Sequence, residues 1–171
     1  MRTILISSFV SKIFSHNISM CANHSFLVDN QVDLVTSFVT FHHVSELQTI
    51  LAELVRILRV GGYLIIREHD CENKQSLSAK YLNFVHAIMM IAGVGEFADS
   101  QHAKNDDYEN WDKQKMDIIE YTKSIRYRSC SEWNKELNNV GFRHRATLRY
   151  GANGSENPQN LFYAVYRLET K

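Results

Sequence analysis

Several residue types that mark particular classes of protein are scarce in this chain. Its three cysteines, Cys21, Cys71 and Cys130, are odd in number and scattered, which argues against the disulfide framework of a secreted protein. We therefore expect a cytoplasmic location with reduced thiols. The 19 basic and 19 acidic residues cancel, so no overall field gathers nucleic acid or an anionic membrane surface.

Long hydrophobic runs are also missing. No segment reaches the roughly 18 apolar residues of a membrane span, and the nearest, Phe84 to Val94, is interrupted by His86. Residues 1–16 are atypical but show no small-residue cleavage site, so we predict no signal peptide. With 171 residues and 44% hydrophobic content, residues 1–171 are expected to form a single domain with a substantial core.

The most informative segment is Val32 to Asp70, because its pattern predicts a strand, a helix and a second strand. The apolar run Leu34–Val39 has too little alternation for a strand with one wet face, so we expect it to be buried on both sides, and a second run, Tyr63–Ile66, follows the helix. Two such strands form a right-handed parallel crossover unit, whose ligands bind beyond the carboxyl ends of the strands. The active edge is therefore expected at Ser37–His43 and Glu68–Cys71.

The helix between these strands is predicted over about residues 46–59. Ser45 and Gln48 have the spacing of a capping box, and Gly61 and Gly62 are expected to end the helix. Apolar residues recur between these points at intervals of three and four, which is typical of one buried helical face. They are Leu47, Ile50, Leu51, Leu54 and Leu58.

At these residues the chain resembles the class I S-adenosylmethionine-dependent methyltransferases, particularly the type 11 group. The matching parts are Asp33-Leu34-Val35, His42-His43, the stretch from Glu53 to Gly62 with its Glu-x-x-Arg-x-Leu-x-x-Gly-Gly pattern, and the apolar strand Tyr63–Ile66. The resemblance implies an α/β fold with an incomplete Rossmann-like sheet, mostly parallel, with an antiparallel pair at the C-terminal end. It also implies a methyltransferase that uses S-adenosyl-L-methionine.

The glycine-rich cofactor loop of that family has no counterpart here. No glycine precedes Gly61, and the residues before Val32 are too few for the elements that the family has there, so the chain looks like the carboxyl-terminal part of such a domain. Loss of two charge-assisted groups, each contributing about 1.5–3 kcal/mol, would weaken cofactor binding roughly 10²- to 10⁴-fold.

The missing first strand would leave an open edge beside the Asp33 strand. The segment Thr3–Val10 could cover it as a strand, and a short helix is the alternative for this segment. A second chain in a homo- or hetero-oligomer could also cover it.

The resemblance also implies where the cofactor would lie. Asn23 and His24 occupy the loop near the adenine, and Ser37, Phe38 and Val39 would flank the methionine and the adenine.

Three histidines at the expected edge, His42, His43 and His69, are candidate catalytic bases, because the ordinary pKa of histidine is close to neutral. In the alternative, one of the first pair caps the helix or packs under the cofactor while the other is solvated, and Asp70 caps the next helix. No His-x-x-x-His or Cys-x-x-Cys pair is present, so no metal site is predicted.

The remaining chain is expected to complete the fold. The pattern predicts a helix over 78–91 ended by Gly93 and Gly95, followed by a polar lid or loop over 96–117. A capping box at Ser129 and Glu132 predicts another helix, ended by Gly141.

Two strands follow that helix. In the first, Phe142, His144, Ala146 and Leu148 alternate with polar residues, and Leu161–Tyr166 is its antiparallel neighbour.

The sequence thus favours an S-adenosylmethionine-dependent methyltransferase with intact, weakened or lost activity. The alternatives are a noncatalytic methyltransferase-like binding or regulatory module, or a fragment completed by another chain. The methyl acceptor is not predicted, and no membrane partner is expected. A group of arginines leaves a nucleic-acid partner open, although a solvated strand face explains it more simply. They are Arg126, Arg128, Arg143, Arg145 and Arg149.

Overall fold

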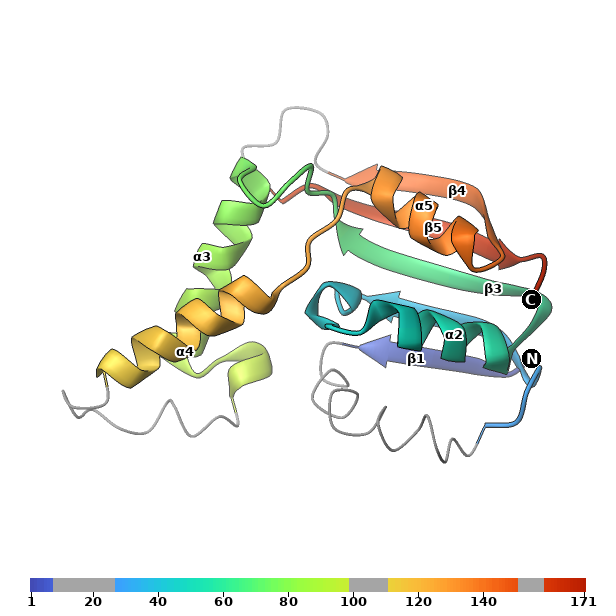
Figure 1. The fold of residues 1–171 in the computed structure, drawn as a ribbon, viewed down its shortest axis with the longest axis horizontal. Helices are drawn as coiled ribbons and strands as arrows, with labels where there is room; N and C mark the ends of the chain where they lie inside the picture. Colours follow the sequence, from blue (N-terminus) through green and yellow to red (C-terminus); the bar gives the residue numbers. More distant parts are fainter. Residues whose placement is uncertain (8–26, 99–110, 151–158) are drawn as a thin grey trace.

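The computed structural model describes residues 1–7, 27–98, 111–150 and 159–171, and these form a five-stranded sheet with helices on one face and at one end (Figure 1). The strand order is β1-β2-β3-β5-β4, with β1, β2 and β3 parallel and β5 antiparallel to both of its neighbours. The predicted α/β fold, mostly parallel with an antiparallel pair, is confirmed. The strands are β1 (Thr3–Ser7), β2 (Val32–Phe38), β3 (Leu58–His69), β4 (Phe142–Tyr150) and β5 (Leu161–Leu168).

The strand alternative for the N-terminal segment is confirmed over residues 3–7, and residues 8–10 lie outside the described part. β1 pairs in parallel with β2, with Thr3 opposite Leu34. The Asp33 carboxylate fixes the start of this pair, because its Oδ2 accepts a hydrogen bond from the backbone nitrogen of Arg2 at 2.7 Å. The edge of β2 is therefore covered by this chain itself.

Helix α2 (Leu47–Ile57) is shorter than predicted at both ends. Its N-cap is Glu46, which makes no side-chain capping bond. The predicted capping box of Ser45 and Gln48 is therefore wrong. The Gln48 side chain instead donates to Glu136 at 2.6 Å.

The prediction that two glycines end this helix is also wrong, because β3 begins at Leu58 and contains both of them. Gly61 has φ +84° within an irregularity of the β2–β3 pairing. A Cβ on Gly62 would lie 3.1 Å from the carbonyl oxygen of Asp33 in β2 and 2.9 Å from that of Arg59. The glycines thus allow β3 to bend close to β2.

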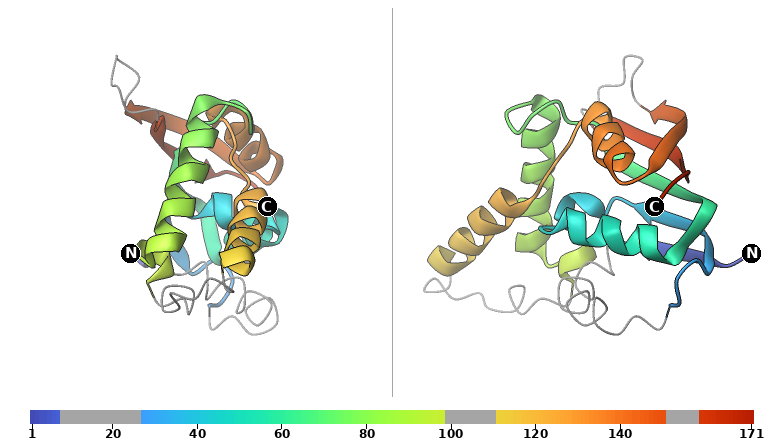
Figure 2. Two further views of the ribbon diagram at one scale, coloured as in Figure 1. Left: turned by 90° about the vertical axis from the view of Figure 1, so that its left-hand side faces the viewer. Right: turned by 45° about the vertical axis from the view of Figure 1, so that its right-hand side comes forward.

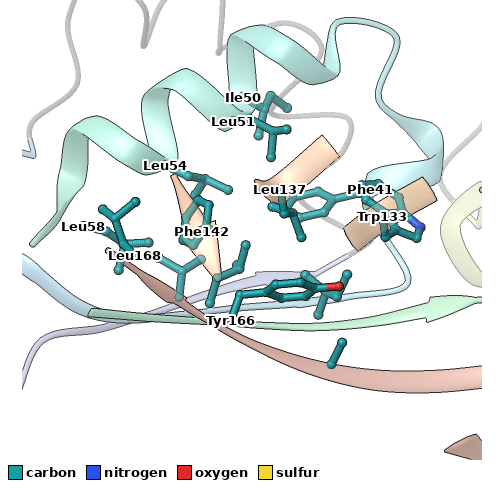
Figure 3. Packing of buried hydrophobic residues seen from close by; sticks show 14 of the residues in the cluster. Phe41, Ile50, Leu51, Leu54, Leu58, Trp133, Leu137, Phe142, Tyr166 and Leu168 are labelled. Atoms are coloured by element: carbon teal, nitrogen blue, oxygen red, sulfur yellow. The ribbon is translucent and has the colours of Figure 1, made fainter. Parts of the chain in front are cut away.

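The main core lies between the sheet and the two helices α2 and α5 (Cys130–Asn139), which pack on the same face. Figure 3 shows side chains of α2 pointing toward those of α5 and of the sheet. Trp133 and Tyr166, both fully buried, are the largest members. Burying one such large apolar side chain contributes about 1.5–3 kcal/mol.

The opposite face of the sheet is only half buried. In β2, Val35 and Ser37 are buried while Leu34 and Thr36 are intermediate. The prediction of a strand buried on both sides is therefore wrong, because both helices that pack on the described sheet lie on one face.

The C-terminal elements follow the predicted order. Ser129 and Glu132 form the predicted capping box of α5, and Gly141 follows this helix with φ +95°. β4 and β5 are antiparallel, but the pairing shifts between His144 and Ala146. This bulge ends the predicted alternation, because residues after it turn to the other face.

Two helices, α3 (Leu77–Ala92) and α4 (Trp111–Ser124), lie beyond the carboxyl ends of β1, β2 and β3, as Figures 1 and 2 both show. Helix α3 is capped by the Ser76 side chain and ends at Gly93 in the left-handed conformation, as predicted. The loop prediction for 96–117 is wrong for residues 111–117, which are helical, while residues 99–110 lie outside the described part.

The stretch Leu77–Phe97 is long and apolar enough to cross a membrane by length and composition alone. Its inward side chains include Leu82, His86 and Met90, whereas Phe84 and Ile88 are exposed. One such helix is weak evidence for a membrane location, since helices of soluble proteins pass the same test. The cytoplasmic location stays a prediction.

Candidate functional site

The carboxyl ends of β2 and β3 are tied together by one buried carboxylate. Glu68, near the end of β3, accepts hydrogen bonds at Oε1 from the backbone nitrogens of Thr40 (3.0 Å) and Phe41 (2.8 Å). Its Oε2 lies 2.7 Å from Nδ1 of His42. Glu68 therefore holds the short helix η1 (Phe41–His43), which carries two of the candidate histidines, against β3.

The turn that leads into η1 is strained. Val39 has φ +53°, a left-handed conformation that is unusual for a β-branched residue. Its backbone nitrogen donates to the carbonyl oxygen of Arg67 in β3 at 2.7 Å, and the next nitrogen, that of Thr40, donates to Glu68. Strain of this kind persists where neighbouring bonds determine the conformation, and it is frequent at functional sites.

Four histidines gather at this edge from three elements. His42 and His43 come from η1, His69 ends β3, and His86 lies on the buried side of α3. The ring centroids of His42 and His43 are 3.9 Å apart, and those of His43 and His86 are 5.3 Å apart. His69 lies 5.5 Å from His42 by the same measure.

Two tyrosines and a second glutamate surround the histidines. Tyr121 of α4 donates through its hydroxyl to Oε1 of Glu96 at 2.6 Å and lies 3.0 Å from Nδ1 of His43. The hydroxyl of Tyr127 lies 3.1 Å from Nδ1 of His86. Nε2 of His43 and Nε2 of His86 each lie 3.7 Å from an oxygen of Glu96.

Burial keeps the four imidazoles neutral at pH 7. Burial, with a smaller contribution from neighbouring histidines, lowers the pKa of His42 to about 3, of His43 to about 2 and of His69 to about 3. Burial also lowers the pKa of His86, and a hydrogen bond to the backbone of Leu82 opposes that shift.

The pKa of Glu68 moves in the other direction. Burial raises it, while the electrostatic interaction with His69 and the backbone donors Phe41 and Thr40 oppose the rise.

A pocket of about 420 Å³ opens beside this cluster. Leu82, Val85 and Met89 of α3 form an apolar wall. The polar lining residues are His43, Arg67, His69, His86, Glu96 and Gln159. A pocket with an apolar wall and a few polar groups has the composition of a small-molecule site.

Two of the three candidate bases line the pocket, and the third does not. His43 and His69 line the pocket. His42 is 1% exposed, lies behind them and is not among the lining residues. Neither His42 nor His43 is solvated, and neither caps α2, so these two parts of the alternative for the pair are wrong. Its remaining part, that one of them packs under the cofactor, stays a prediction.

The residues that were predicted to contact the cofactor lie in different surroundings. Val39 lines the pocket, Ser37 is fully buried, and Phe38 packs edge to face on Tyr163 at 5.9 Å between ring centroids. Asn23 and His24 lie outside the described residues.

Asp70 does not cap the next helix, α3, as the alternative for it proposed. Its Oδ1 accepts from the backbone nitrogen of Cys130 at the start of α5 at 2.8 Å, and its Oδ2 pairs with Arg149. Arg145 pairs with Glu169, so two of the grouped arginines already have acidic partners within the chain.

Sequence reasoning missed four members of the site: His86, Glu96, Tyr121 and Tyr127. The one available signal was His86, a polar residue inside the otherwise apolar stretch of α3. Its nearness to His42 and His43 depends on how α3 crosses the end of the sheet, which spacing does not encode.

Residues 12–66 match the family model of the type 11 group, described as a methyltransferase domain. No curated protein matches the chain by sequence. The fold is similar to that of a SAM-dependent methyltransferase of Thermotoga maritima, with a TM-score of 0.55 and 15% identity over 98% of this chain and 82% of that one.

Two further solved structures share the fold. A SAM-dependent methyltransferase from Aquifex aeolicus has a TM-score of 0.50 and 14% identity, covering 98% of this chain and 82% of that one. Geranyl diphosphate C-methyltransferase from Streptomyces coelicolor A3(2), solved with Mg²⁺, geranyl diphosphate and S-adenosyl-L-homocysteine, has a TM-score of 0.53 and 7% identity over 98% and 71% of the two chains. At these identities the similarity is one of fold.

Proposed function

We propose that this chain, which has the fold of the S-adenosylmethionine-dependent methyltransferases, transfers a methyl group from that cofactor to an acceptor held in the histidine-lined pocket. The observation that carries the proposal is the position of the pocket. It lies at the carboxyl ends of β2 and β3, where ligands bind in parallel α/β sheets, and two of its lining residues, Val39 and His43, belong to the segment with the family match.

The described residues fit the cofactor in part. β1 and β2 end side by side, with Ser7 opposite Phe38, at the edge where the family holds it. The glycine-rich loop is absent from the sequence before Gly61. We therefore expect binding to be weaker than in relatives that have this loop.

When bound, S-adenosylmethionine supplies an electrophilic methyl group. The pocket residues would bind the acceptor, orient its nucleophile and exclude water. His43 and His69 are the bases nearest the pocket, but their low pKa values make them weak bases at neutral pH. We therefore expect an acceptor that loses its proton easily or has none to lose, with most of the rate coming from positioning.

A noncatalytic binding module is the second candidate. The observation that favours it is the lack of any glycine before Gly61, which removes the main cofactor-binding loop of the family. In this case the pocket would bind a ligand without methyl transfer.

Calorimetric titration of the purified chain with S-adenosylmethionine and with S-adenosylhomocysteine separates the two candidates. A dissociation constant in the micromolar range supports the methyltransferase. No heat change at millimolar concentration of either compound favours the noncatalytic module. The variant His69→Asn tests the site, because it should lower methyl transfer, whereas the matched variant His144→Asn on exposed β4 should not.

A further inference from the structure

Three of the clustered histidines have the geometry of a metal-binding group. His42, His43 and His86 each offer one ring nitrogen, and these nitrogens all lie within 4.8 Å of one another. Two of them come from η1 and the third from α3, so two separate elements of the fold supply the group.

In each of these three rings Nδ1 already faces another partner. Nδ1 of His42 lies 2.7 Å from Glu68, Nδ1 of His43 lies 3.0 Å from Tyr121, and Nδ1 of His86 lies 3.1 Å from Tyr127. Histidines that bind metals usually donate their other ring N–H to a neighbouring group, which orients the ring and fixes the tautomer. The arrangement leaves Nε2 of each ring as the ligand atom.

The hydroxyl of Tyr121 fixes the tautomer of His43. This hydroxyl has one proton and donates it to Glu96, so it accepts from Nδ1–H of His43. Nε2 of His43 then carries a lone pair. Nδ1 of His42 lies 2.7 Å from Oε2 of Glu68, so Nε2 is the ring nitrogen of His42 that is left outside this contact.

The unpaired Nε2 of His42 is the second, independent observation. His42 is 1% exposed, and its Nε2 is buried without a hydrogen-bond partner within residues 1–7, 27–98, 111–150 and 159–171. Buried polar atoms are nearly always paired, so an unpaired one suggests a missing ligand.

We propose that His42, His43 and His86 bind a divalent transition-metal ion through their Nε2 atoms, with Zn²⁺ as the best match. Imidazole ligands favour Zn²⁺ and similar ions over Mg²⁺ and Ca²⁺. A tetrahedral ion with Zn–N bonds of 2.0–2.1 Å needs nitrogens about 3.3 Å apart. The rings must therefore move closer by small rotations on binding.

Glu96 stands where a fourth ligand would be needed. Its two carboxylate oxygens each lie 3.7 Å from an Nε2, one from that of His43 and the other from that of His86. Since Glu96, His43 and His86 also line the pocket, the fourth position of the ion faces the pocket and is filled either by Glu96 or, in its place, by a water or a ligand oxygen. The proposal does not depend on methyl transfer, because metal binding can be measured without the cofactor.

The test uses the full chain, free of an affinity tag and treated with a chelator, titrated with Co²⁺ and with Zn²⁺. We expect one tight equivalent and the intense visible absorption of tetrahedral Co²⁺, which Zn²⁺ abolishes by competition. His43→Gln and His86→Gln should each weaken Zn²⁺ binding by about 100-fold, and Tyr121→Phe by about 10-fold. The exposed His144→Gln, which lies outside the cluster, should leave it unchanged.

Three results would overturn the proposal. They are the absence of binding, a weak octahedral Co²⁺ spectrum, and an unchanged affinity in both cluster variants, which would assign the ion to other histidines. If the cluster variants fail to fold, the melting temperature of the unaltered chain decides. It must rise with equimolar Zn²⁺ and rise less in Tyr121→Phe.

Discussion

Oε2 of Glu68 lies 2.7 Å from Nδ1 of His42, and both side chains are almost fully buried where β3 meets the turn after β2. The same carboxylate accepts the backbone N–H groups of Thr40 and Phe41. One residue of β3 therefore sets both the path of the turn and the orientation of the first histidine. The N-cap residue of η1 makes no side-chain capping bond. The position of η1 in the site therefore depends on Glu68.

Replacing Glu68 should destabilise the chain. Glu68→Leu leaves two buried N–H groups and the neutral His42 without their partner, and each buried group left unsatisfied costs about 1–3 kcal/mol, so we expect a loss of at least about 3 kcal/mol in the free energy of unfolding. Glu68→Gln keeps one acceptor oxygen and should lose less. Urea unfolding followed by circular dichroism measures both, and the exposed Glu72→Gln serves as the control. An unchanged urea midpoint for Glu68→Leu would contradict the stabilising role of the pair.

The two serines of the predicted capping boxes should differ in their effect. Ser129 accepts from the backbone nitrogen of Glu132 at the start of α5, so Ser129→Ala should cost about 1 kcal/mol. Ser45 makes no capping bond to α2, and Ser45→Ala should lie within about 0.5 kcal/mol of the unaltered chain. Equal losses in chemical unfolding would contradict the assigned helix starts.

Gly61→Ala should destabilise the bend in β3. The backbone there has φ +84°, and a left-handed conformation costs about 1–2 kcal/mol for a residue with a Cβ. Gly62→Ala should be at least as costly, because its Cβ would press on two backbone oxygens. Thermal unfolding of the two variants checks this, and melting temperatures equal to that of the unaltered chain would refute the predicted strain.

Cys71 should be unreactive in the folded chain. Burial, with a smaller contribution from the nearby carboxylates of Asp70 and Glu68, raises the pKa of its thiol to about 12. At pH 8.5 alkylation of Cys71, followed by peptide mass spectrometry, should be much slower in the native chain than in urea. Equal rates in both states would show that the thiol is accessible.

The same shift predicts how stability depends on pH. The pKa of this thiol is higher in the folded state than its ordinary value of 9.0. Its contribution is therefore fully present below pH 9 and is lost as the pH rises toward 12, because the unfolded chain releases the proton first. Cys71→Ser should reduce this alkaline loss in pH-dependent unfolding, and an identical alkaline profile in the variant would contradict the assignment.

Much of the fold could be predicted from the sequence, because the β2–α2–β3 unit has a strong local pattern. The predicted resemblance to type 11 methyltransferases is confirmed by the family match and the shared fold. Details that depend on tertiary contacts failed. Gln48 bonds to Glu136 instead of capping its own helix, and Gly61 and Gly62 serve the strand pairing instead of the helix end.

The candidate site was only half predictable. The edge itself follows from strand direction, which brought His43 and His69 to the pocket. The approach of His86 and Glu96 depends on the path of α3 across that edge, and no periodicity in the sequence encodes it. Spacing along the chain also predicted that no metal site is present. This prediction stays untested, because spacing does not encode the approach of His86.

We expect this chain to hold a methyl-donor cofactor where β1 and β2 end. Hydrogen exchange with mass spectrometry, with and without saturating S-adenosylhomocysteine, tests it most directly, because it reports both binding and place. The account predicts slower exchange in peptides that cover Ser37–His43, and little change in β4. Unchanged exchange at Ser37–His43, or protection confined to another part of the chain, would contradict it.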